Sequence, residues 1–82
     1  MNLIGIGLGN YISAERVIAV VSPDSAPIKR MVSDCKDNGT AIDSTYGRRT
    51  RSVIIMDSGQ IVLSSLQPGT IVERNLIKEL TR

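Results

Sequence analysis

The sequence predicts a small α+β domain: an antiparallel-rich sheet with one amphipathic helix between strands, a β-hairpin and a short C-terminal helix. The 82-residue chain contains eleven Ile and seven Val but no Phe or Trp, and β-branched side chains suit a pleated sheet. One internal segment repeats its apolar residues with the period of a helix. Two β-rich segments flank a polar turn, as in a hairpin. The length fits a single domain over residues 1–82.

The N-terminal segment LIGIGLGN interleaves apolar residues with three glycines. Leu3, Ile4 and Ile6 predict a short strand. The glycines form G-x-G-x-G rather than the G-x-G-x-x-G of a dinucleotide-binding turn, and the residues that follow look extended rather than helical. We therefore expect the glycines to serve a bulge or a close backbone approach.

A strand and a helix come next. RVIAVV, residues 16–21, is a β-branched run, and SPDSAP after it offers capping serines (Ser22, Ser25) and first-turn prolines (Pro23, Pro27). The apolar face of the helix has the spacing i, i+3, i+4 and i+7 and consists of Ile28, Met31, Val32 and Cys35. An Asn–Gly pair predicts the end of this helix.

The C-terminal half predicts a strand, a hairpin and a second helix. TAIDST is a short strand. SVIIM (52–56) and IVLSSL (61–66) flank the turn DSGQ and predict the hairpin. TIVE matches a capping box, Thr70 with Glu73, which predicts that a helix opens there.

Two of the predicted strands carry information about assembly. VIAVV and VIIM do not alternate apolar with polar residues, and such strands need cover on both faces. The first helix can cover one face, and so short a chain leaves little for the other. We therefore expect a second copy of the chain to cover it. The alternative is that one face is partly wet.

The composition argues against several functions. A chain with no His and a single Cys35 has no imidazole base, no internal disulfide and no zinc ligand set. Asp43 lies close to Ser44 and Thr45, which we interpret as turn hydrogen bonding rather than catalysis. No signal-peptide pattern and no membrane-length apolar run occur. We expect a cytoplasmic protein that is not an enzyme, with no cofactor, metal, membrane or small-molecule substrate.

The strongest functional signal is TYGRRTR, residues 45–51, which we call the arginine loop. It holds three of the seven arginines, and no acidic residue occurs between Ser44 and Met56. The planar fork of Arg suits phosphate oxygens and guanine edges. Gly47 lets the backbone turn outward. For Tyr46, one alternative is packing at the base of the loop. Three interpretations stay open: a nucleic-acid site, a site for an acidic protein or small phosphorylated ligand, and an ordinary solvated surface.

Duplex DNA is the favoured nucleic acid, and RNA the weaker alternative. Proteins that bind single strands stack bases on exposed aromatic rings, and this chain offers only Tyr11 and Tyr46. A duplex can be held through its phosphates. About three phosphates per subunit would give weak, salt-sensitive binding. Several subunits in one assembly would multiply these contacts.

Three motifs in this order, IGIGLGN, SPDSAPIKRM and IDSTYGRRTR, make the chain resemble the RemA family of small bacterial regulators, the extracellular matrix regulatory proteins. The resemblance covers Ile4 to Val72. It implies DNA-binding transcriptional activators of biofilm-matrix genes that assemble as closed rings with DNA along a basic exterior. It also implies a compact α+β fold likened to the LytTR type of DNA-binding domain.

The resemblance also implies roles for particular residues. The DNA contacts of the family match Arg16, Arg48 and Arg49, further basic positions match Arg51 and Arg30, and a functionally important proline at the helix start matches Pro27. The chain departs from the expected pattern at acidic Glu15, next to Arg16, and at Cys35. The expected function is a homo-oligomeric, nucleoid-associated regulator that binds double-stranded DNA. The alternative is an interaction scaffold whose arginine loop captures an acidic protein or other anionic partner.

Overall fold

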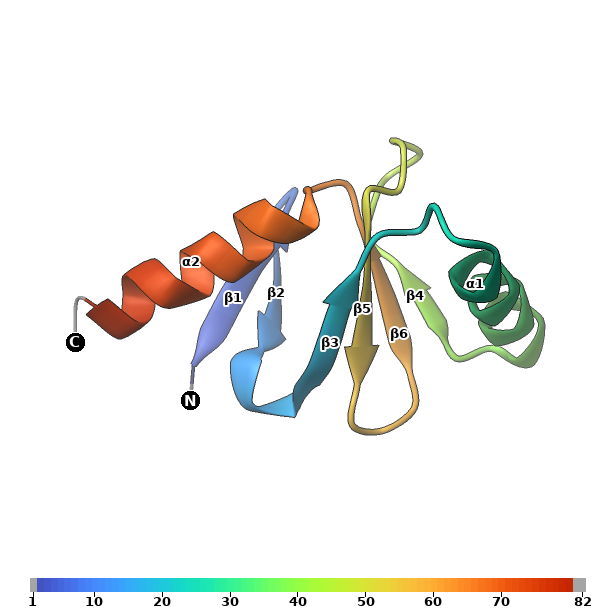
Figure 1. Ribbon diagram of the computed structural model, residues 1–82, viewed down its shortest axis with the longest axis horizontal. Helices are drawn as coiled ribbons and strands as arrows, with labels where there is room; N and C mark the ends of the chain where they lie inside the picture. Colours follow the sequence, from blue (N-terminus) through green and yellow to red (C-terminus); the bar gives the residue numbers. More distant parts are fainter. Residues whose placement is uncertain (1, 81–82) are drawn as a thin grey trace.

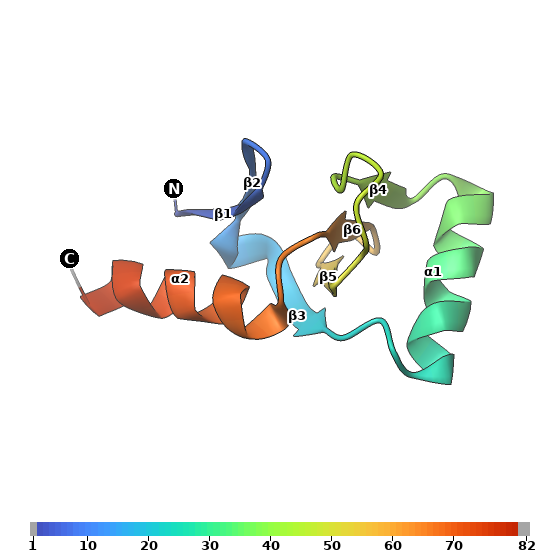
Figure 2. The ribbon, with the colours of Figure 1, turned by 90° about the horizontal axis from the view of Figure 1, so that it is seen from above.

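The protein folds as an α+β domain, as the sequence predicts, and its four-stranded sheet lies between two covering layers of the same chain. The computed structural model describes residues 2–80, with side chains through residue 75. The elements are β1 (Leu3–Gly7), β2 (Asn10–Ser13), the 3-10 turn η1 (Ala14–Arg16), β3 (Val17–Val21), α1 (Ala26–Asn38), β4 (Ala41–Asp43), β5 (Ser52–Met56), β6 (Ile61–Ser64) and α2 (Pro68–Leu80). Helix α1 lies on one side of the sheet, and the β1–β2 hairpin and α2 lie on the other (Figures 1 and 2).

The central sheet has the strand order β3-β5-β6-β4. The predicted hairpin is confirmed: β5 pairs antiparallel with β6, with Val53 opposite Leu63. Strand β5 also pairs antiparallel with β3. Strand β4 is shorter than the predicted segment and runs parallel to β6. Four chain segments therefore meet at one end of the sheet: β3, β4 and β6 end there, and β5 begins there.

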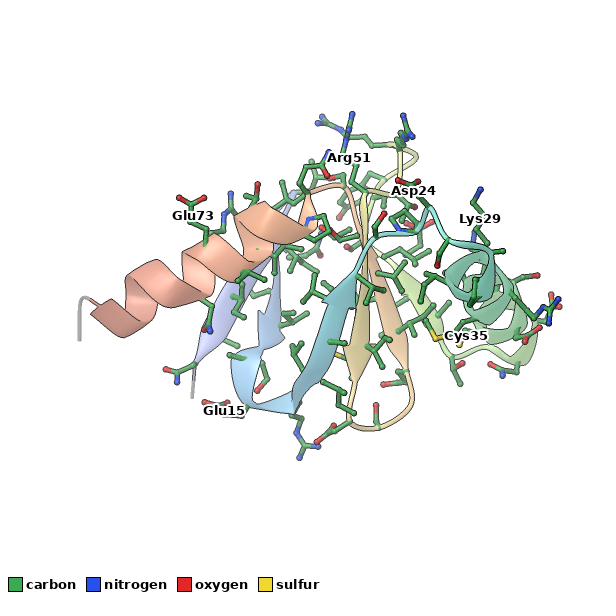
Figure 3. All side chains as sticks on the ribbon, viewed as in Figure 1. Glu15, Asp24, Lys29, Cys35, Arg51 and Glu73 are labelled. Carbon is green, nitrogen blue, oxygen red and sulfur yellow. The ribbon has the colours of Figure 1, made fainter. Side chains whose placement is uncertain are left out.

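Helix α1 begins and ends where the sequence predicts. The Ser25 side chain caps it by accepting a hydrogen bond from the Ile28 N–H at 3.4 Å, and Pro27 occupies the first turn. Gly39 ends it in the left-handed conformation, with φ of 79°, which glycine adopts without steric cost. Cys35 is buried against the sheet, as expected (Figure 3).

The N-terminal glycines form the predicted bulge. The register of β1 against β2 shifts between Gly5 and Gly7, and Gly7 has φ of 100°. A Cβ on Gly7 would lie 3.3 Å from the Cγ of Leu66. The hairpin thus approaches the segment after β6 closely, and the Ser64 Oγ donates a hydrogen bond to the Ile6 carbonyl at 2.7 Å.

The two faces of the sheet have separate apolar cores, so the expectation that a second copy covers one face is wrong for the central strands. Val53, Ile61 and Leu63 pack with Cys35 under α1. The alternate residues of the same strands pack with side chains from the hairpin and α2: Ile4, Ile6, Ile12, Ile54, Val62 and Ile71. The β1–β2 hairpin, together with Ile71 of α2, therefore supplies the cover that the sequence pattern alone did not assign.

Helix α2 begins earlier than predicted. The Thr70 and Ile71 N–H groups both donate to the Gln67 carbonyl, so the helix opens at Pro68 and the proposed capping box at Thr70 is wrong. Proline is favoured in the first turn because that turn leaves its N–H groups unused. Within residues 2–80, no helix is long and apolar enough to cross a membrane.

Candidate nucleic-acid interface

The arginine loop connects β4 to β5 and is fixed to β6 at both ends. On the β4 side, the N–H and Oγ of Ser44 donate to the Leu63 carbonyl at 3.1 and 2.6 Å. On the β5 side, the Arg51 N–H donates to the Ser64 carbonyl at 2.9 Å. Because neighbouring residues of one buried strand hold both ends, the loop leaves the sheet with a defined direction (Figure 1).

Asp43 and Thr45 form a second anchor at the base of the loop. The Oδ1 of Asp43 accepts hydrogen bonds from the Thr45 N–H at 2.9 Å and from its Oγ1 at 2.6 Å. The Thr45 hydroxyl, then its N–H, and the nearby Lys36 hold the pKa of Asp43 below its ordinary value. Thr45 is only 2% exposed. The interpretation of these residues as a hydrogen-bonded turn is therefore confirmed.

The tip of the loop is a tight turn with Tyr46 and Gly47 at its centre. Their φ angles are 52° and 81°, and the Arg48 N–H donates to the Thr45 carbonyl at 3.0 Å. Two successive positive φ angles are the signature of a type I′ turn. The Tyr46 side chain is 77% exposed. The alternative in which Tyr46 packs at the base of the loop is wrong, because Thr45 is the buried residue there.

The three arginines of the loop are exposed and lack ion-pair partners among the described side chains. In that part of the chain, the one ion pair joins the Arg16 Nη1 to the Asp57 Oδ1 at 3.4 Å, far from the loop. Both helices also begin at the loop end of the sheet (Figure 1), and a helix N-terminus carries partial positive charge. This end of the molecule is therefore cationic.

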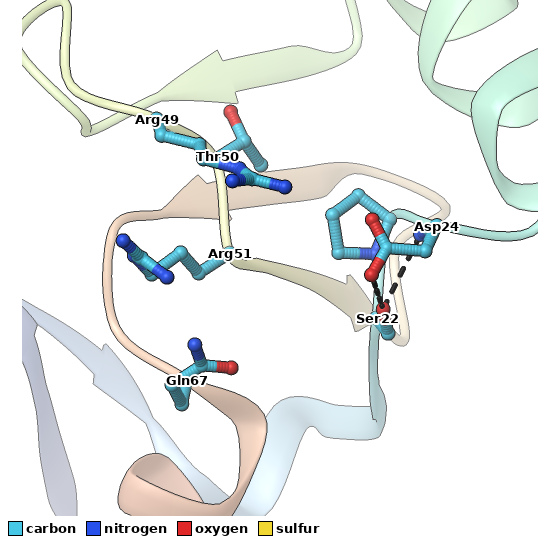
Figure 4. Close-up of a pocket in the computed structure, with 7 residues that line it drawn as sticks. Ser22, Asp24, Arg49, Thr50, Arg51 and Gln67 are labelled. Atoms are coloured by element: carbon cyan, nitrogen blue, oxygen red, sulfur yellow. Dashed lines mark hydrogen bonds between the residues drawn. The ribbon is translucent and has the colours of Figure 1, made fainter.

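A small cavity of about 80 Å³ lies beside the loop (Figure 4). The loop lines it with Arg49, Thr50 and Arg51, and Gln67 closes it from the start of α2. Asp24 is the one acidic residue in its lining, and its carboxylate accepts a hydrogen bond from the Ser22 hydroxyl at 3.1 Å. The cavity thus offers guanidinium, amide and hydroxyl donors to an anion, with one carboxylate at its rim.

The structure brings some predicted site residues together and separates others. Arg16 lies at the far end of β3, five residues or about 17 Å from the loop end, and its side chain is 68% exposed. Arg30 lies on α1, where it lines a shallow hollow with Ala26 and Pro27. Within one subunit the loop arginines therefore form one surface, Arg30 lies beside the helix start, and Arg16 stands apart.

Sequence reasoning missed a groove between α1 and the arginine loop. The groove has a volume of about 320 Å³, and Lys29 and Lys36 line it together with Arg49, over a floor that includes Val32 and Leu63. Figure 3 shows Lys29 on the side of α1 near the loop. The signal was available, because residues seven apart lie on one helix face. What the sequence did not reveal is that this face borders the loop.

Fold and surface together define a class: a small α+β domain with an exposed cationic loop that is fixed at both ends to its central sheet. Comparison with known proteins identifies the family. The family model described as RemA-like, extracellular matrix regulatory protein A-like, matches residues 3–74. The chain belongs to this family.

The curated relatives include extracellular matrix regulatory protein A of Bacillus subtilis, which is 58% identical over 79 residues, 96% of this chain and 89% of the relative. Putative regulatory proteins of Bacillus pumilus and Microcystis aeruginosa are equally similar, with the same coverage of both chains. These names support a regulatory role. The resemblance to the RemA family inferred from the three sequence motifs is confirmed.

Proposed function

We propose that the protein is a homo-oligomeric transcriptional regulator of the extracellular-matrix type that binds double-stranded DNA through its arginine loops. The observation that carries the proposal is the loop itself: three exposed arginines without a described carboxylate partner, on a segment fixed at both ends to β6. Rigid presentation lowers the ordering cost of binding. In this role the protein would work in the cytoplasm, associated with the nucleoid.

The binding mechanism is electrostatic. Arg48 and Arg49 grip DNA phosphates, Arg51 supports them from the base of the loop, and Arg30 adds charge beside the start of α1. Arg16 joins when a phosphate displaces Asp57, which is feasible because an exposed ion pair contributes only about 0–1 kcal/mol. Phosphate contacts carry no sequence information. Specificity therefore comes mainly from the shape and deformability of the duplex, with A·T-rich tracts as the favoured targets.

Self-association is supported by the edges of the sheet. Ile18 on the edge strand β3 is 67% exposed, and Ile42 on the opposite edge strand β4 is 50% exposed. An apolar groove of about 260 Å³ runs beside β3, lined in part by Val17 and Val72. If the β3 edge of one subunit pairs with the β4 edge of the next, the contact is head-to-tail. Such contacts close into a ring when the rotation between successive subunits adds up to a full turn.

The test replaces Arg48 and Arg49 together by Gln. Each lost arginine–phosphate contact should reduce the slope of the logarithm of the association constant against the logarithm of the salt concentration. The reduction should be about 1 per contact in every subunit that binds the duplex. We expect the double variant to lose most of its duplex affinity, measured by fluorescence anisotropy from low to moderate salt. Arg48→Lys/Arg49→Lys should retain part of it, because the charge stays and only the fork is lost.

The matched control is Arg74→Gln, which removes a positive charge from α2 at a distance from the loop. Arg74 Nη1 donates to the Gly5 carbonyl at 2.9 Å, so this variant affects packing without touching the loop. It should bind duplex like the wild type. Unchanged affinity in a correctly assembled Arg48/Arg49 variant would contradict the proposal. If adding the wild-type protein leaves the anisotropy of the duplex unchanged at low salt, the alternative is favoured, in which the protein is a scaffold that captures an acidic protein.

A further inference from the structure

We infer that Tyr46 is a DNA-contacting residue of the arginine loop, whose ring inserts at a base step in the minor groove and makes binding sensitive to how easily that step unstacks. The inference rests on the proposed function. To the phosphate contacts of the arginines, the inference adds a residue that contacts bases. Three observations carry it: the exposure of the ring, the backbone conformation that presents it, and its position two residues before Arg48 in the same turn.

Tyr46 occupies a position that its residue type does not favour. Its φ of 52° lies in the left-handed region, where non-glycine residues are uncommon and Asn and Asp are enriched. The first central position of a type I′ turn before glycine prefers those residues. An aromatic ring would normally offset such strain by packing, yet 77% of Tyr46 is exposed. Strain without a packing benefit is typical of functional positions.

The surroundings of Tyr46 hold it in place. The Thr45–Arg48 hydrogen bond closes the turn, and the Asp43–Thr45 hydrogen bonds fix its base. The ring is therefore attached to a defined backbone, not to a flexible tail. A Cβ at the neighbouring Gly47 would meet nothing within 4 Å, so the tip has open space on that side into which a groove wall can fit.

The chemistry of the tip matches a known mode of minor-groove binding. Proteins that kink duplexes pair arginine contacts with an inserted side chain that partly unstacks a base step. Pyrimidine–purine steps such as TA unstack most easily. With Arg48 and Arg49 holding the adjacent phosphates, the ring of Tyr46 is positioned to insert. The partner of the Tyr46 ring is thus a deformable base step of duplex DNA, and a G·C-rich step is the disfavoured alternative.

The first experiment compares Tyr46→Asn and Tyr46→Phe with the wild type. Asn–Gly suits a type I′ turn, so Tyr46→Asn should keep or raise the melting temperature. Its dissociation constant for a duplex with a central TA step should rise about tenfold, the size of a typical stacking loss. Its preference for that duplex over one with a central GC step should disappear. Tyr46→Phe should keep both the affinity and the preference.

The second experiment uses the fluorescence of the ring. The chain has two tyrosines and no tryptophan, so Tyr11→Phe leaves Tyr46 as the one fluorophore. Saturating TA-step duplex should quench its emission strongly. Normal affinity in Tyr46→Asn, or unchanged Tyr46 emission in the saturated complex, would overturn the inference.

The outcomes separate the two proposals. Loss of binding in Arg48→Gln/Arg49→Gln with normal binding in Tyr46→Asn refutes the role of Tyr46 and leaves the proposed function in place. A wild-type protein that binds no duplex at all refutes both.

Discussion

At the scale of single residues, buried hydroxyl side chains join the central strands to neighbouring segments of the chain. Ser52 and Ser64 are fully buried on the central strands, and they donate to the carbonyls of Leu66 and Ile6. No buried polar atom among the described side chains lacks a hydrogen-bond partner. Each hydroxyl therefore joins a strand to a neighbouring segment at little desolvation cost.

Asp43 is the residue whose loss should loosen the arginine loop most directly. Asp43→Ala removes the acceptor of both Thr45 hydrogen bonds and should lower the free energy of unfolding by about 1 kcal/mol at neutral pH. Duplex affinity should fall as well, because the loop would have to be ordered on binding. Urea unfolding and anisotropy titrations measure the two effects, and Asp43→Asn, which keeps an acceptor oxygen, should show smaller ones.

The pKa of Asp43 gives this anchor a pH dependence of known sign. The Thr45 hydrogen bonds lower the pKa of Asp43 in the folded state, so its contribution to stability is present above the unfolded pKa of about 3.9 and is lost as the pH falls through the folded value. The stability difference between wild type and Asp43→Asn should therefore shrink in acid. A difference that stays constant from neutral pH to about pH 2 would show that the Asp43 charge contributes nothing to this anchor.

At the scale of elements, local patterns predicted what local physics determines. Helix α1 follows from its apolar spacing and its Ser25 and Gly39 caps, and the β5–β6 hairpin follows from two β-branched runs around a short turn. The predicted start of α2 is wrong because Pro68, two residues before the capping-box match at Thr70, occupies the first helical position. The parallel pairing of β4 with β6 could not be predicted, because it depends on where α1 returns the chain.

The cover of the second sheet face is a long-range feature. It depends on the Ile6–Ser64 hydrogen bond, which joins residues 58 apart, and on the fit of the glycine bulge against Leu66. The periodicity of the strands showed that cover was needed but gave no information on its source. The hairpin is thus the element that makes the single chain a complete domain.

Gly7 is the position at which this hairpin should be most sensitive. Gly7→Ala combines a strained positive φ with a Cβ 3.3 Å from the Leu66 side chain, and it should destabilise the domain by about 3 kcal/mol. Gly9 also has positive φ but open space at its Cβ, so Gly9→Ala should cost only about 1 kcal/mol. Denaturant unfolding measures the stability of both variants, and the difference between their losses gives the cost of crowding the Leu66 side chain. Equal losses would mean that the approach to Leu66 is not tight.

At the scale of the whole molecule, charge and apolar surface are separated. The loop end is cationic, and the exposed Ile18 and Ile42 lie on opposite edges of the sheet. The arginine loop could be singled out from sequence because three arginines without acids are unusual in composition. The shared helix face of Lys29 and Lys36 was visible in the sequence, but the closeness of that face to the loop and the exposure of Tyr46 depend on how the chain folds back.

The proposed assembly predicts a specific result for variants at the two edges. Lysine on an edge strand opposes pairing, and both isoleucines are exposed in the single chain, so Ile18→Lys and Ile42→Lys should fold normally and be monomeric by native mass. They should also bind duplex more weakly, because the arginine loops are no longer linked in one assembly. Ile18→Val, which keeps an apolar β-branched side chain, should assemble like the wild type.

Mixing the two lysine variants distinguishes a head-to-tail contact from a symmetric one. Ile18→Lys keeps an intact β4 edge and Ile42→Lys keeps an intact β3 edge, so one molecule of each can join through their unaltered edges. Both remaining edges then carry lysine, and growth stops at a pair. Native mass spectrometry of the mixture should show a two-chain species that neither variant forms alone. If Ile42→Lys alone stays oligomeric, the contact is instead β3 against β3, and a ring built from alternating edges is refuted.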